Sequence, residues 1–353
     1  MTSAVWIVLV DFNGIEDTRR CLRSLVGQTA PVQVVVVDNA SRIDVSAALA
    51  VEFSWVAFVR SDVNGGWAGG NNIGMRHVLA RGADLMILLN NDTVVGPEFT
   101  ERMTAAAAAH PDYGMIGPVI RFLAPPHEVQ TDGVKFNRPQ KSGFFQRHPV
   151  PLVASVVPGI VEVDIVNGCC LMVRRTTVES IGLIDEEFFL IHEESDFCLR
   201  SQAAGFKNGV LTESLVWHKG SSSFQREGKR LQRYFDARNL LRLIGRHGGR
   251  KGSRGQVRSY GHHLRYAFHR YAIERDKNFD DSASAVIQGL YDGLLSRWGP
   301  FVKEARRPGL GIVAWVFDKL WRYGSSKTPA KATQSELPAA SSVAVGPAPP
   351  ISV

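Results

Sequence analysis

The sequence predicts an α/β fold, with a mostly parallel sheet flanked by helices and a helical, basic C-terminal extension. Four continuous apolar segments have the composition of strands that are buried on both faces, namely residues 5–12, 32–39, 55–60 and 84–92. Segments with a helical spacing of apolar residues lie between them. Strands that alternate with helices in this way are typical of a parallel sheet that helices cover on both sides.

The helices expected in this first part of the chain are residues 16–28, 44–53, 72–83 and 97–110. The first carries apolar side chains at Cys21, Leu22 and Leu25, which lie on one face of a helix. Pro97 suits the first turn of the last, because that position needs no backbone N–H.

The second part of the chain has a different pattern. Residues 113–174 contain shorter strands between loops rich in proline and glycine, and residues 161–175 are expected to form one strand. A helix is expected at 193–205, ending at Gly205. Residues 225–322 are expected to be mainly helical and basic.

Charge is distributed unevenly along the chain, whose net charge is +7. Residues 221–353 carry 23 Lys and Arg against 10 Asp and Glu, whereas residues 1–220 carry 18 against 24. A basic surface is suited to nucleic acid or to anionic lipid. We therefore expect the two halves to have different tasks.

The four cysteines are expected to be reduced core residues of a cytoplasmic protein, since Cys21, Cys169, Cys170 and Cys198 show neither CxxC nor zinc-like spacing. The apolar start lacks a preceding basic segment, unlike a secretory signal. No apolar stretch reaches the roughly 18 residues of a spanning helix. Residues 309–317 are long enough only to lie in a membrane interface.

The early strands end in polar side chains. The first strand ends at Asp11 and Asn13, the second at Asp38 and Asn39, and the fourth at Asn90, Asn91 and Asp92. The carboxyl ends of parallel strands meet at one edge of a sheet, where open α/β folds bind ligands. The pattern therefore predicts a nucleotide crevice, and acidic and amide groups at the first two ends suit a base or ribose better than a phosphate.

The segment "MILLNNDTVV" allows two interpretations of its polar end. Asn and Asp favour turns through hydrogen bonds to their own backbone. Alternatively, the carboxylate of Asp92 is a ligand for a hard divalent cation. With one Asp and two Asn, such a site would bind the cation weakly until a diphosphate completed its coordination.

The glycine-rich segment "NGGWAGGNNIG" is expected to be a loop. It contains no GxGxxG and follows the third strand rather than the first, so it does not match the dinucleotide fingerprint. Its glycines would let the backbone approach a ligand, with Asn64, Asn71 or Asn72 as hydrogen-bond donors. An ordinary glycine-rich turn is the alternative.

Six carboxylates lie between residues 185 and 196, and Glu193, Glu194 and Asp196 begin the expected helix. Acidic residues favour a helix N-terminus, which accounts for one or two of them. A partly desolvated carboxylate at such a place makes a good general base. His218 ends another strand-like segment, where it is either structural or, near a metal or diphosphate, a ligand or hydrogen-bond donor.

Together these segments resemble the inverting family 2 glycosyltransferases with the A-type nucleotide-sugar-binding (GT-A) fold. The matching pieces occur in family order: "VDFNG", "VVVDNAS", "NGGWAGGNNIGM", "LLNNDT", "NGCCLMVRR", "GLIDEEFFLIHEESDFCLR" and "VWHKGSS". They cover roughly residues 4–245. The branch that they resemble most contains bacterial rhamnosyltransferases of cell-surface polysaccharide synthesis.

The resemblance implies roles for matching residues. The implied nucleotide-sugar-binding residues are Asp11, Asn13, Asp38, Asn39, Asn64, Gly65, Gly66, Asn72, Asn90 and Asn91. The implied metal ligands, for Mg²⁺ or Mn²⁺, are Asp92 and His218, and Asn90 stands where the family has its first acidic residue. The implied base is Glu194, with Glu193 or Asp196 as alternatives.

The implied reaction moves a sugar, by preference L-rhamnose from dTDP-rhamnose, to a hydroxyl of a polysaccharide or lipid-linked glycan. The metal would neutralise the leaving nucleoside diphosphate, and the base would take the acceptor proton. The implied partners are a dTDP- or UDP-sugar, a glycan or polyprenyl-diphosphate-linked acceptor and an anionic membrane, with no nucleic acid. The expected location is the inner face of the cytoplasmic membrane.

The expected organisation has three parts. Residues 1–224 form the catalytic domain, with a nucleotide-sugar half at about 1–120 and an acceptor half at about 121–224. Residues 225–324 form the basic helical region, which is expected to associate with the membrane. Residues 325–353, rich in Pro, Ala and Ser, are expected to be disordered.

Three alternative functions stay open. A UDP-sugar-dependent enzyme of the same family differs only in its donor. A sugar nucleotidyltransferase would ordinarily need a glycine-rich basic loop after the first strand, where this chain has the acidic "VDFNGIEDT". An RNA-binding protein would use aromatic residues among the basic ones, such as Tyr234 and Phe235, but this leaves the acidic cluster unexplained.

Overall fold

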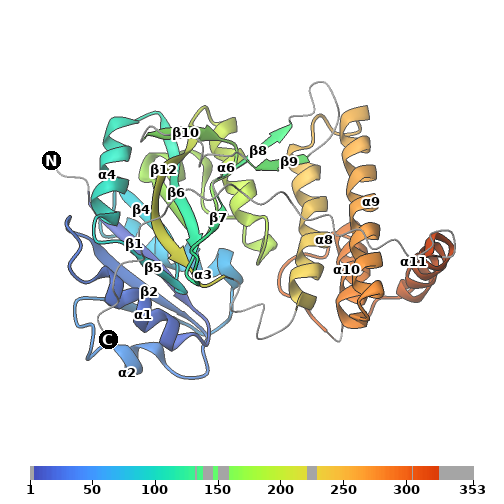
Figure 1. Ribbon diagram of the computed structural model, residues 1–353, viewed down its shortest axis with the longest axis horizontal. Coiled ribbons are helices and arrows are strands. Elements are labelled where there is room, and N and C mark those ends of the chain that lie inside the picture. The colour runs from blue at the N-terminus through green and yellow to red at the C-terminus, as the bar shows by residue number, and fades with distance from the viewer. Residues whose placement is uncertain are drawn as a thin grey trace. The chain divides into compact units, whose positions relative to one another are not determined.

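The computed structural model describes residues 4–131, 133–137, 146–149, 159–220, 229–303 and 305–325. The chain packs as two compact units (Figure 1). The first contains the described residues up to 220, and the second contains those from 229 onward. The expected boundary at residue 224 and residues 326–353 of the expected disordered tail lie outside the described residues.

The first unit alternates strands and helices. Its elements are β1 (Val5–Asp11), α1 (Ile15–Leu25), β2 (Gln33–Asn39), α2 (Val45–Leu49), β3 (Ala57–Ser61), α3 (Gly66–Leu79), β4 (Leu85–Asn90), β5 (Thr93–Val95), α4 (Phe99–Ala109), β6 (Tyr113–Phe122), β7 (Val129–Thr131), β8 (Val134–Asn137), β9 (Gln146–Pro149), β10 (Ile160–Val163), β11 (Cys170–Arg174), α5 (Arg175–Ile181), the 3₁₀ turn η2 (Glu186–Phe188), α6 (Glu193–Ala203) and β12 (Lys207–His218). The four early strands and the helix expected at 193–205 are confirmed.

A ten-stranded sheet forms the centre of this unit, and β8 pairs with β9 in a second, small sheet. The main order is β10-β12-β6-β11-β4-β1-β2-β3, with β5 beside β12 and β7 beside β6. The four early strands are parallel, and β6 is parallel to β12. Between these two groups, β11 runs antiparallel to both β4 and β6. The expected mostly parallel α/β sheet is therefore confirmed.

The strand expected at 161–175 is instead two strands, so that prediction is wrong. β10 pairs with β12, whereas β11 lies between β4 and β6. The reason is a turn at Asn167, whose side chain accepts a hydrogen bond from the N–H of Cys169 at 2.8 Å. Apolar composition is similar across both strands, so it did not reveal the turn.

The expectation of a loop at the glycine-rich segment is also wrong, because α3 begins at Gly66 and includes all of the segment except Asn64 and Gly65. A Cβ on Gly70 would lie 2.6 Å from Val10 Cγ1, and one on Gly74 would lie 2.2 Å from Val8 Cγ1. The glycines therefore bring the helix into direct contact with β1. Close helix–sheet approach outweighs the low helix propensity of glycine here.

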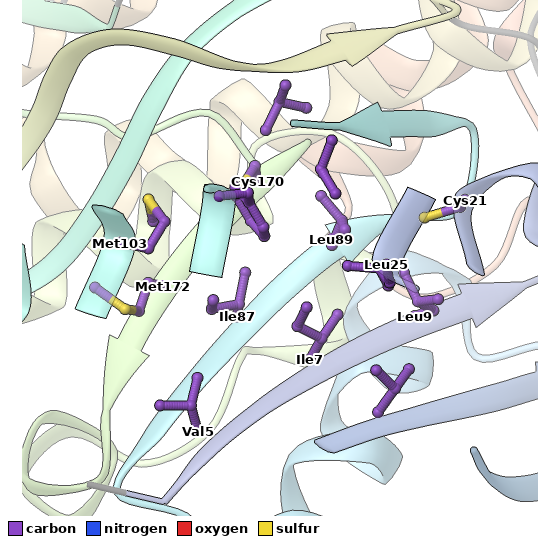
Figure 2. Packing of buried hydrophobic residues seen from close by; sticks show 14 of the residues in the cluster. Val5, Ile7, Leu9, Cys21, Leu25, Ile87, Leu89, Met103, Cys170 and Met172 are labelled. Carbon is purple, nitrogen blue, oxygen red and sulfur yellow. The ribbon is translucent and has the colours of Figure 1, made fainter. Parts of the chain in front are cut away.

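Both faces of β1 are covered. Val5, Ile7 and Leu9 lie in a buried cluster with side chains of α1, α4, β4 and β11 (Figure 2). Val8 and Val10, on the opposite face, meet the glycines of α3. This arrangement explains why the strand is apolar throughout.

The second unit is helical in its described residues, as expected. Its helices are α8 (Lys229–His247), α9 (Arg254–Asp276), α10 (Asp280–Leu294) and α11 (Leu310–Ser325). Its core lies between α8, α9 and α10, and apolar side chains of α11 pack against it. Among the helices of the described chain, none has the length and hydropathy needed to cross a bilayer.

Candidate active site

Asp11, at the end of β1, is buried, and its carboxylate accepts several hydrogen bonds. Its Oδ1 accepts from the N–H of Gly14 at 3.1 Å and from Ser41 Oγ at 3.0 Å. Its Oδ2 accepts from Thr18 Oγ1 at 2.5 Å and from Asn91 Nδ2 at 3.2 Å. The side chain is 0% exposed, so it fixes the strand ends relative to one another.

Asp38, at the end of β2, shapes the following loop. It accepts hydrogen bonds from the N–H of Ser41 at 2.8 Å and of Val45 at 3.3 Å, and it pairs with Arg60. Asn13 is exposed and donates its own N–H to Ser41 Oγ at 2.9 Å. Asn13 is therefore the more accessible of these two predicted nucleotide-binding side chains.

Asn39 holds the start of α3. Its Nδ2 donates to Asn64 Oδ1 and to the carbonyl of Gly66, both at 3.0 Å, and its Oδ1 accepts from the N–H of Gly65 at 3.0 Å. Asn39 is 2% exposed, whereas Asn64 is only half-buried. These four predicted residues therefore lie together as one hydrogen-bonded group.

Asn72 connects α3 to the acidic segment. Its Nδ2 donates to the carbonyl of Ile184 and to Glu186 Oε1, both at 2.8 Å, and its Oδ1 accepts from the N–H of Ile184 at 3.0 Å. Its side chain is almost fully buried. The amide of Asn72 therefore hydrogen-bonds within the chain, and it connects two segments that are far apart in sequence.

The "NND" tripeptide begins at Asn90, the last residue of β4, and each of its side chains has a different partner. Asn90 Oδ1 accepts from the indole N–H of Trp67 at 3.0 Å. Asn91 Nδ2 donates to Thr18 Oγ1 at 2.8 Å as well as to Asp11. The tripeptide is therefore held by α3 on one side and by β1 and α1 on the other.

Asp92 and His218 form a largely buried pair, with Asp92 Oδ1 3.0 Å from His218 Nε2. The other ring nitrogen of His218 lies 2.8 Å from Gln130 Oε1. Burial lowers the pKa of His218, but Cys169 and Asp92 raise it, to about 10. Burial raises the pKa of the Cys169 thiol to about 11, so at pH 7 it is neutral. Asp92 is the charge that holds the proton on His218.

The three carboxylates at the start of α6 have different surroundings. Asp196 is 0% exposed and accepts from Arg200 Nε at 2.8 Å. Glu193 is 5% exposed, and its Oε2 has no hydrogen-bond partner among the described residues. Burial and the nearby charge of Glu194 raise the pKa of Glu193 well above its usual value. Glu194 is half-buried and accepts from Ser195 Oγ at 3.0 Å.

Glu194 and Trp67 meet at Gly168, in the turn between β10 and β11. A Cβ on Gly168 would lie 3.3 Å from Trp67 Cζ2 and 3.4 Å from Glu194 Cβ. Trp67 in turn contacts Asn90. Gly168 and Trp67 therefore connect Glu194 to the end of β4, more than 100 residues away in the sequence.

The Asp92–His218 pair reaches the same turn through Cys169, whose thiol hydrogen-bonds with His218. Gly168 and Cys169 are consecutive, and consecutive Cα atoms are about 3.8 Å apart. The predicted base and the predicted metal ligands therefore contact neighbouring residues of one turn. Asp196 does not join them, because it is paired with Arg200.

A divalent cation fits this donor set only in part. Asp92 offers a carboxylate, which is a suitable ligand, whereas His218 carries a proton in this pair and offers an imidazole nitrogen only after losing it. Within the described residues, no group of three or more His, Cys, Asp or Glu side chains is placed to hold a metal ion. Mg²⁺ is commonly bound through one or two carboxylates and completed by substrate phosphates, and Asp92 supplies one such carboxylate.

The sequence patterns missed four residues of this site. Trp67 and Gly168 connect the strand end to the acidic helix, Gln130 contacts His218, and Cys169 lies beside it. All four cysteines are buried with free thiols, as expected. Trp67 lies inside the glycine-rich segment, where a large aromatic residue was itself a signal.

The sheet with polar strand ends and the acidic helix beside them define a glycosyltransferase of the GT-A type. The model for "Glycosyl transferase family 2" matches residues 6–158, and that for "Glycosyl transferase family group 2" matches residues 85–271, more than half of the chain. The chain therefore belongs to the family 2 glycosyltransferases.

Curated relatives carry related names. The Haloferax volcanii low-salt glycan biosynthesis hexosyltransferase Agl10 is 24% identical over 66% of this chain and 73% of its own. The Shigella flexneri dTDP-rhamnosyl transferase RfbF is 25% identical over 69% of this chain and 81% of its own. The Mycobacterium tuberculosis N-acetylglucosaminyl-diphospho-decaprenol L-rhamnosyltransferase is 26% identical over 64% and 80%.

Solved structures share the fold at low identity. Residues 1–349 of S. aureus TarS superpose with a TM-score of 0.52 and 12% identity, covering 91% of this chain and 92% of that one. GalNAc-T7, solved with UDP, GalNAc and Mn²⁺, gives a TM-score of 0.52 and 15% identity, over 70% of this chain and 53% of that one.

Proposed function

We propose that this glycosyltransferase is an inverting hexosyltransferase that transfers L-rhamnose from dTDP-rhamnose to a hydroxyl of a polysaccharide or lipid-linked glycan. The observation that carries the proposal is the meeting of Glu194 and Trp67 at Gly168, next to Asn90. Two relatives bear rhamnosyl transferase names, which supports the choice of donor.

Glu194 is the general base of the proposed reaction. Asp196 is engaged by Arg200, and the raised pKa of Glu193 favours its neutral form. Glu194 is the more accessible carboxylate and lies beside Trp67 and Gly168. It takes the proton of the acceptor hydroxyl while that oxygen bonds to the anomeric carbon and the bond to the nucleoside diphosphate breaks.

The nucleotide-binding residues divide into two groups by burial. Asp11, Asp38, Asn39 and Asn72 hold the strand ends and the start of α3 in place. The more accessible members contact the donor, and these are Asn13, Asn64, Asn90 and Asn91, with the backbone of Gly65, whereas Gly66 is buried against Phe189. Amide groups of this kind suit the hydrogen-bonding edges of a base, a ribose and a sugar.

Asp92 and His218 hold Mg²⁺ or Mn²⁺ in this proposal, with the donor diphosphate supplying the remaining ligands. When bound, the metal neutralises the negative charge that develops on the leaving nucleoside diphosphate. Asp11 and Thr18 contribute by fixing Asn91, the residue that precedes the metal-binding aspartate.

In the same proposal, three parts of the chain have different functions. Residues 1–120 bind the nucleotide sugar and residues 121–224 the acceptor. The basic helical region, 225–324, associates with anionic lipid at the inner face of the cytoplasmic membrane, where a polyprenyl-diphosphate-linked acceptor resides. Residues 229–325 carry 20 Lys and Arg against 8 Asp and Glu, which supports this placement.

A panel of nucleotide sugars tests the donor. The full chain is unfolded thermally with dTDP-rhamnose, UDP-glucose or UDP-galactofuranose, each with and without Mn²⁺. Metal-dependent stabilisation by dTDP-rhamnose is expected, and it should disappear in Asp92→Asn but persist in the exposed control Asp62→Asn. Stabilisation by UDP-sugars alone would overturn the donor, and the absence of any response would contradict the site.

A further inference from the structure

Helix α11 has two apolar faces, and one of them is packed. Phe317 contacts the rings of Phe268 and Tyr271 at centroid distances of 5.6 and 5.5 Å. Trp321 Nε1 donates to Asp276 Oδ1 at 2.8 Å. These contacts with α9 fix the rotation of α11 about its own axis, so the identity of the outward residues is determined.

The outward face of α11 is also apolar, although it is exposed. Its large apolar residues are Ile312, Trp315, Val316, Leu320 and Tyr323, which are 70%, 61%, 40%, 53% and 64% exposed. Counted from Ile312, they follow at three, four, eight and eleven positions, so they form one stripe along the helix. An exposed apolar stripe beside a packed one indicates a surface that binds something else.

Positive charge accompanies this stripe. Lys319 lies in it, with Nζ 5.8 Å from the ring centroid of Trp315. Arg322 at its edge has a 67% exposed side chain and pairs with Asp318 at 2.7 Å. The exposed Lys303 and Arg306 precede the helix, and neither has a carboxylate partner among the described residues. Basic residues near an anionic lipid surface are attracted to it. Trp and Tyr are the side chains that favour the boundary between headgroups and acyl chains.

We propose that the outward face of α11 inserts into the headgroup region of an anionic membrane, with the helix parallel to the surface. This deepens the membrane association in the proposed function and rests on it. No described helix is both long and apolar enough to cross a bilayer, and an amphipathic helix with aromatic and basic residues lies in the interface instead. A second copy of the chain would bring the same positive charge to the stripe, whereas anionic lipid brings the opposite one.

Vesicle flotation of the full chain tests this proposal. The vesicles consist of phosphatidylcholine alone or of phosphatidylcholine with phosphatidylglycerol. Wild type is expected to bind only the anionic vesicles, and added salt should weaken the binding. The double variant Ile312→Ser/Trp315→Ser should bind at least about tenfold more weakly, because two apolar side chains no longer enter the interface.

A matched control removes the same residue types elsewhere. Ile43 and Trp55, in the first unit, are 65% and 43% exposed, so Ile43→Ser/Trp55→Ser should bind vesicles like wild type. Equal binding by wild type and by both double variants would overturn the proposal. A wild-type dimer in light scattering, lost in Ile312→Ser/Trp315→Ser and accompanied by no vesicle binding, would also overturn it and assign the face to a second copy.

Nucleoside diphosphate release with a water-soluble acceptor separates this proposal from the proposed function. Ile312→Ser/Trp315→Ser should keep the wild-type rate there, because α11 takes no part in the chemistry. If Ile312→Ser/Trp315→Ser shows normal release and unchanged vesicle binding, only the role proposed for α11 is contradicted. If the wild type releases no nucleoside diphosphate from any nucleotide sugar but binds vesicles, and the variant loses that binding, the transfer reaction is contradicted. The lipid-binding face of α11 is then still supported.

Discussion

At the scale of single residues, the three carboxylates that begin α6 show how the surroundings of a side chain determine what it can do. They lie within four positions of one another and have the same charge in the sequence. In the structure Asp196 is paired, Glu193 is buried with one oxygen lacking a hydrogen-bond partner among the described residues, and Glu194 is half-buried beside Trp67. In the proposed function, the third is the carboxylate that takes the proton of the acceptor.

Substitution of Glu194 is therefore expected to affect chemistry rather than donor binding. Glu194→Gln should lower kcat by about 10²- to 10⁴-fold, which is the usual contribution of a general base. Donor binding, measured by the thermal shift with dTDP-rhamnose, should stay as in wild type. A Glu194→Gln enzyme with normal kcat, next to an inactive Glu193→Gln enzyme, would move the base to Glu193.

The indole N–H of Trp67 is expected to position Asn90. Trp67→Phe keeps an aromatic ring but removes the 3.0 Å hydrogen bond, which should lower kcat/KM for the donor by about 2- to 10-fold. Steady-state rates of nucleoside diphosphate release measure this. Trp55→Phe, on the exposed surface, is the matched control and should change nothing. Equal kinetics in the two variants would show that the hydrogen bond does not matter.

At the scale of elements, the close packing of α3 on β1 depends on glycines, which have no side chain at the contact. Gly70 and Gly74 face β1, whereas Gly69 does not, and the space for a Cβ differs sharply between these positions. Gly74 has none, whereas a Cβ on Gly69 would meet only Glu186 Oε2, at 4.0 Å. The same helix therefore contains both a tight and an open glycine.

Alanine at these two positions should have opposite effects on stability. Gly74→Ala would force Val8 and the helix apart, and it should lower the free energy of unfolding by about 1–3 kcal/mol. Gly69→Ala adds a good helix former in open space, and it should raise that free energy by up to about 1 kcal/mol. Urea unfolding of the two variants gives both values. Equal effects would mean that α3 does not press on β1 as described.

At the scale of the whole molecule, buried charge makes stability depend on pH. The pKa of Glu193 is higher in the folded chain than its ordinary value of 4.5. The folded chain then binds more protons than the unfolded chain, so this carboxyl lowers stability progressively as the pH rises above that value. The penalty is complete only above the raised, folded-state pKa.

Glu193→Gln is therefore expected to be more stable than wild type above pH 4.5, and the gain should grow with pH. Thermal unfolding from pH 4 to pH 8 measures the difference in Tm. Glu162→Gln removes an exposed carboxylate of β10 and should show no such trend. A constant or shrinking gain in Glu193→Gln would contradict a buried carboxyl with a raised pKa.

Much of the fold follows from short-range patterns. The four parallel strands, the helix at residue 193 and the helical rear were expected from apolar runs, spacing and composition, which act within a few turns of chain. The boundaries inside 161–175 and the start of α3 were not expected. They depend on partners distant in sequence, namely the different neighbours of β10 and β11 and the contact of glycines with β1.

By itself, the sequence determined the α/β class, the resemblance to family 2 glycosyltransferases and the residue types that the site needs. Only the tertiary structure decided which of those residues is accessible and which is used within the chain. Asp11 and Asn72 have the same side-chain chemistry as an accessible Asp or Asn, but their hydrogen bonds to distant segments bury them. Burial and hydrogen-bond partners arise from long-range packing, which local patterns do not contain.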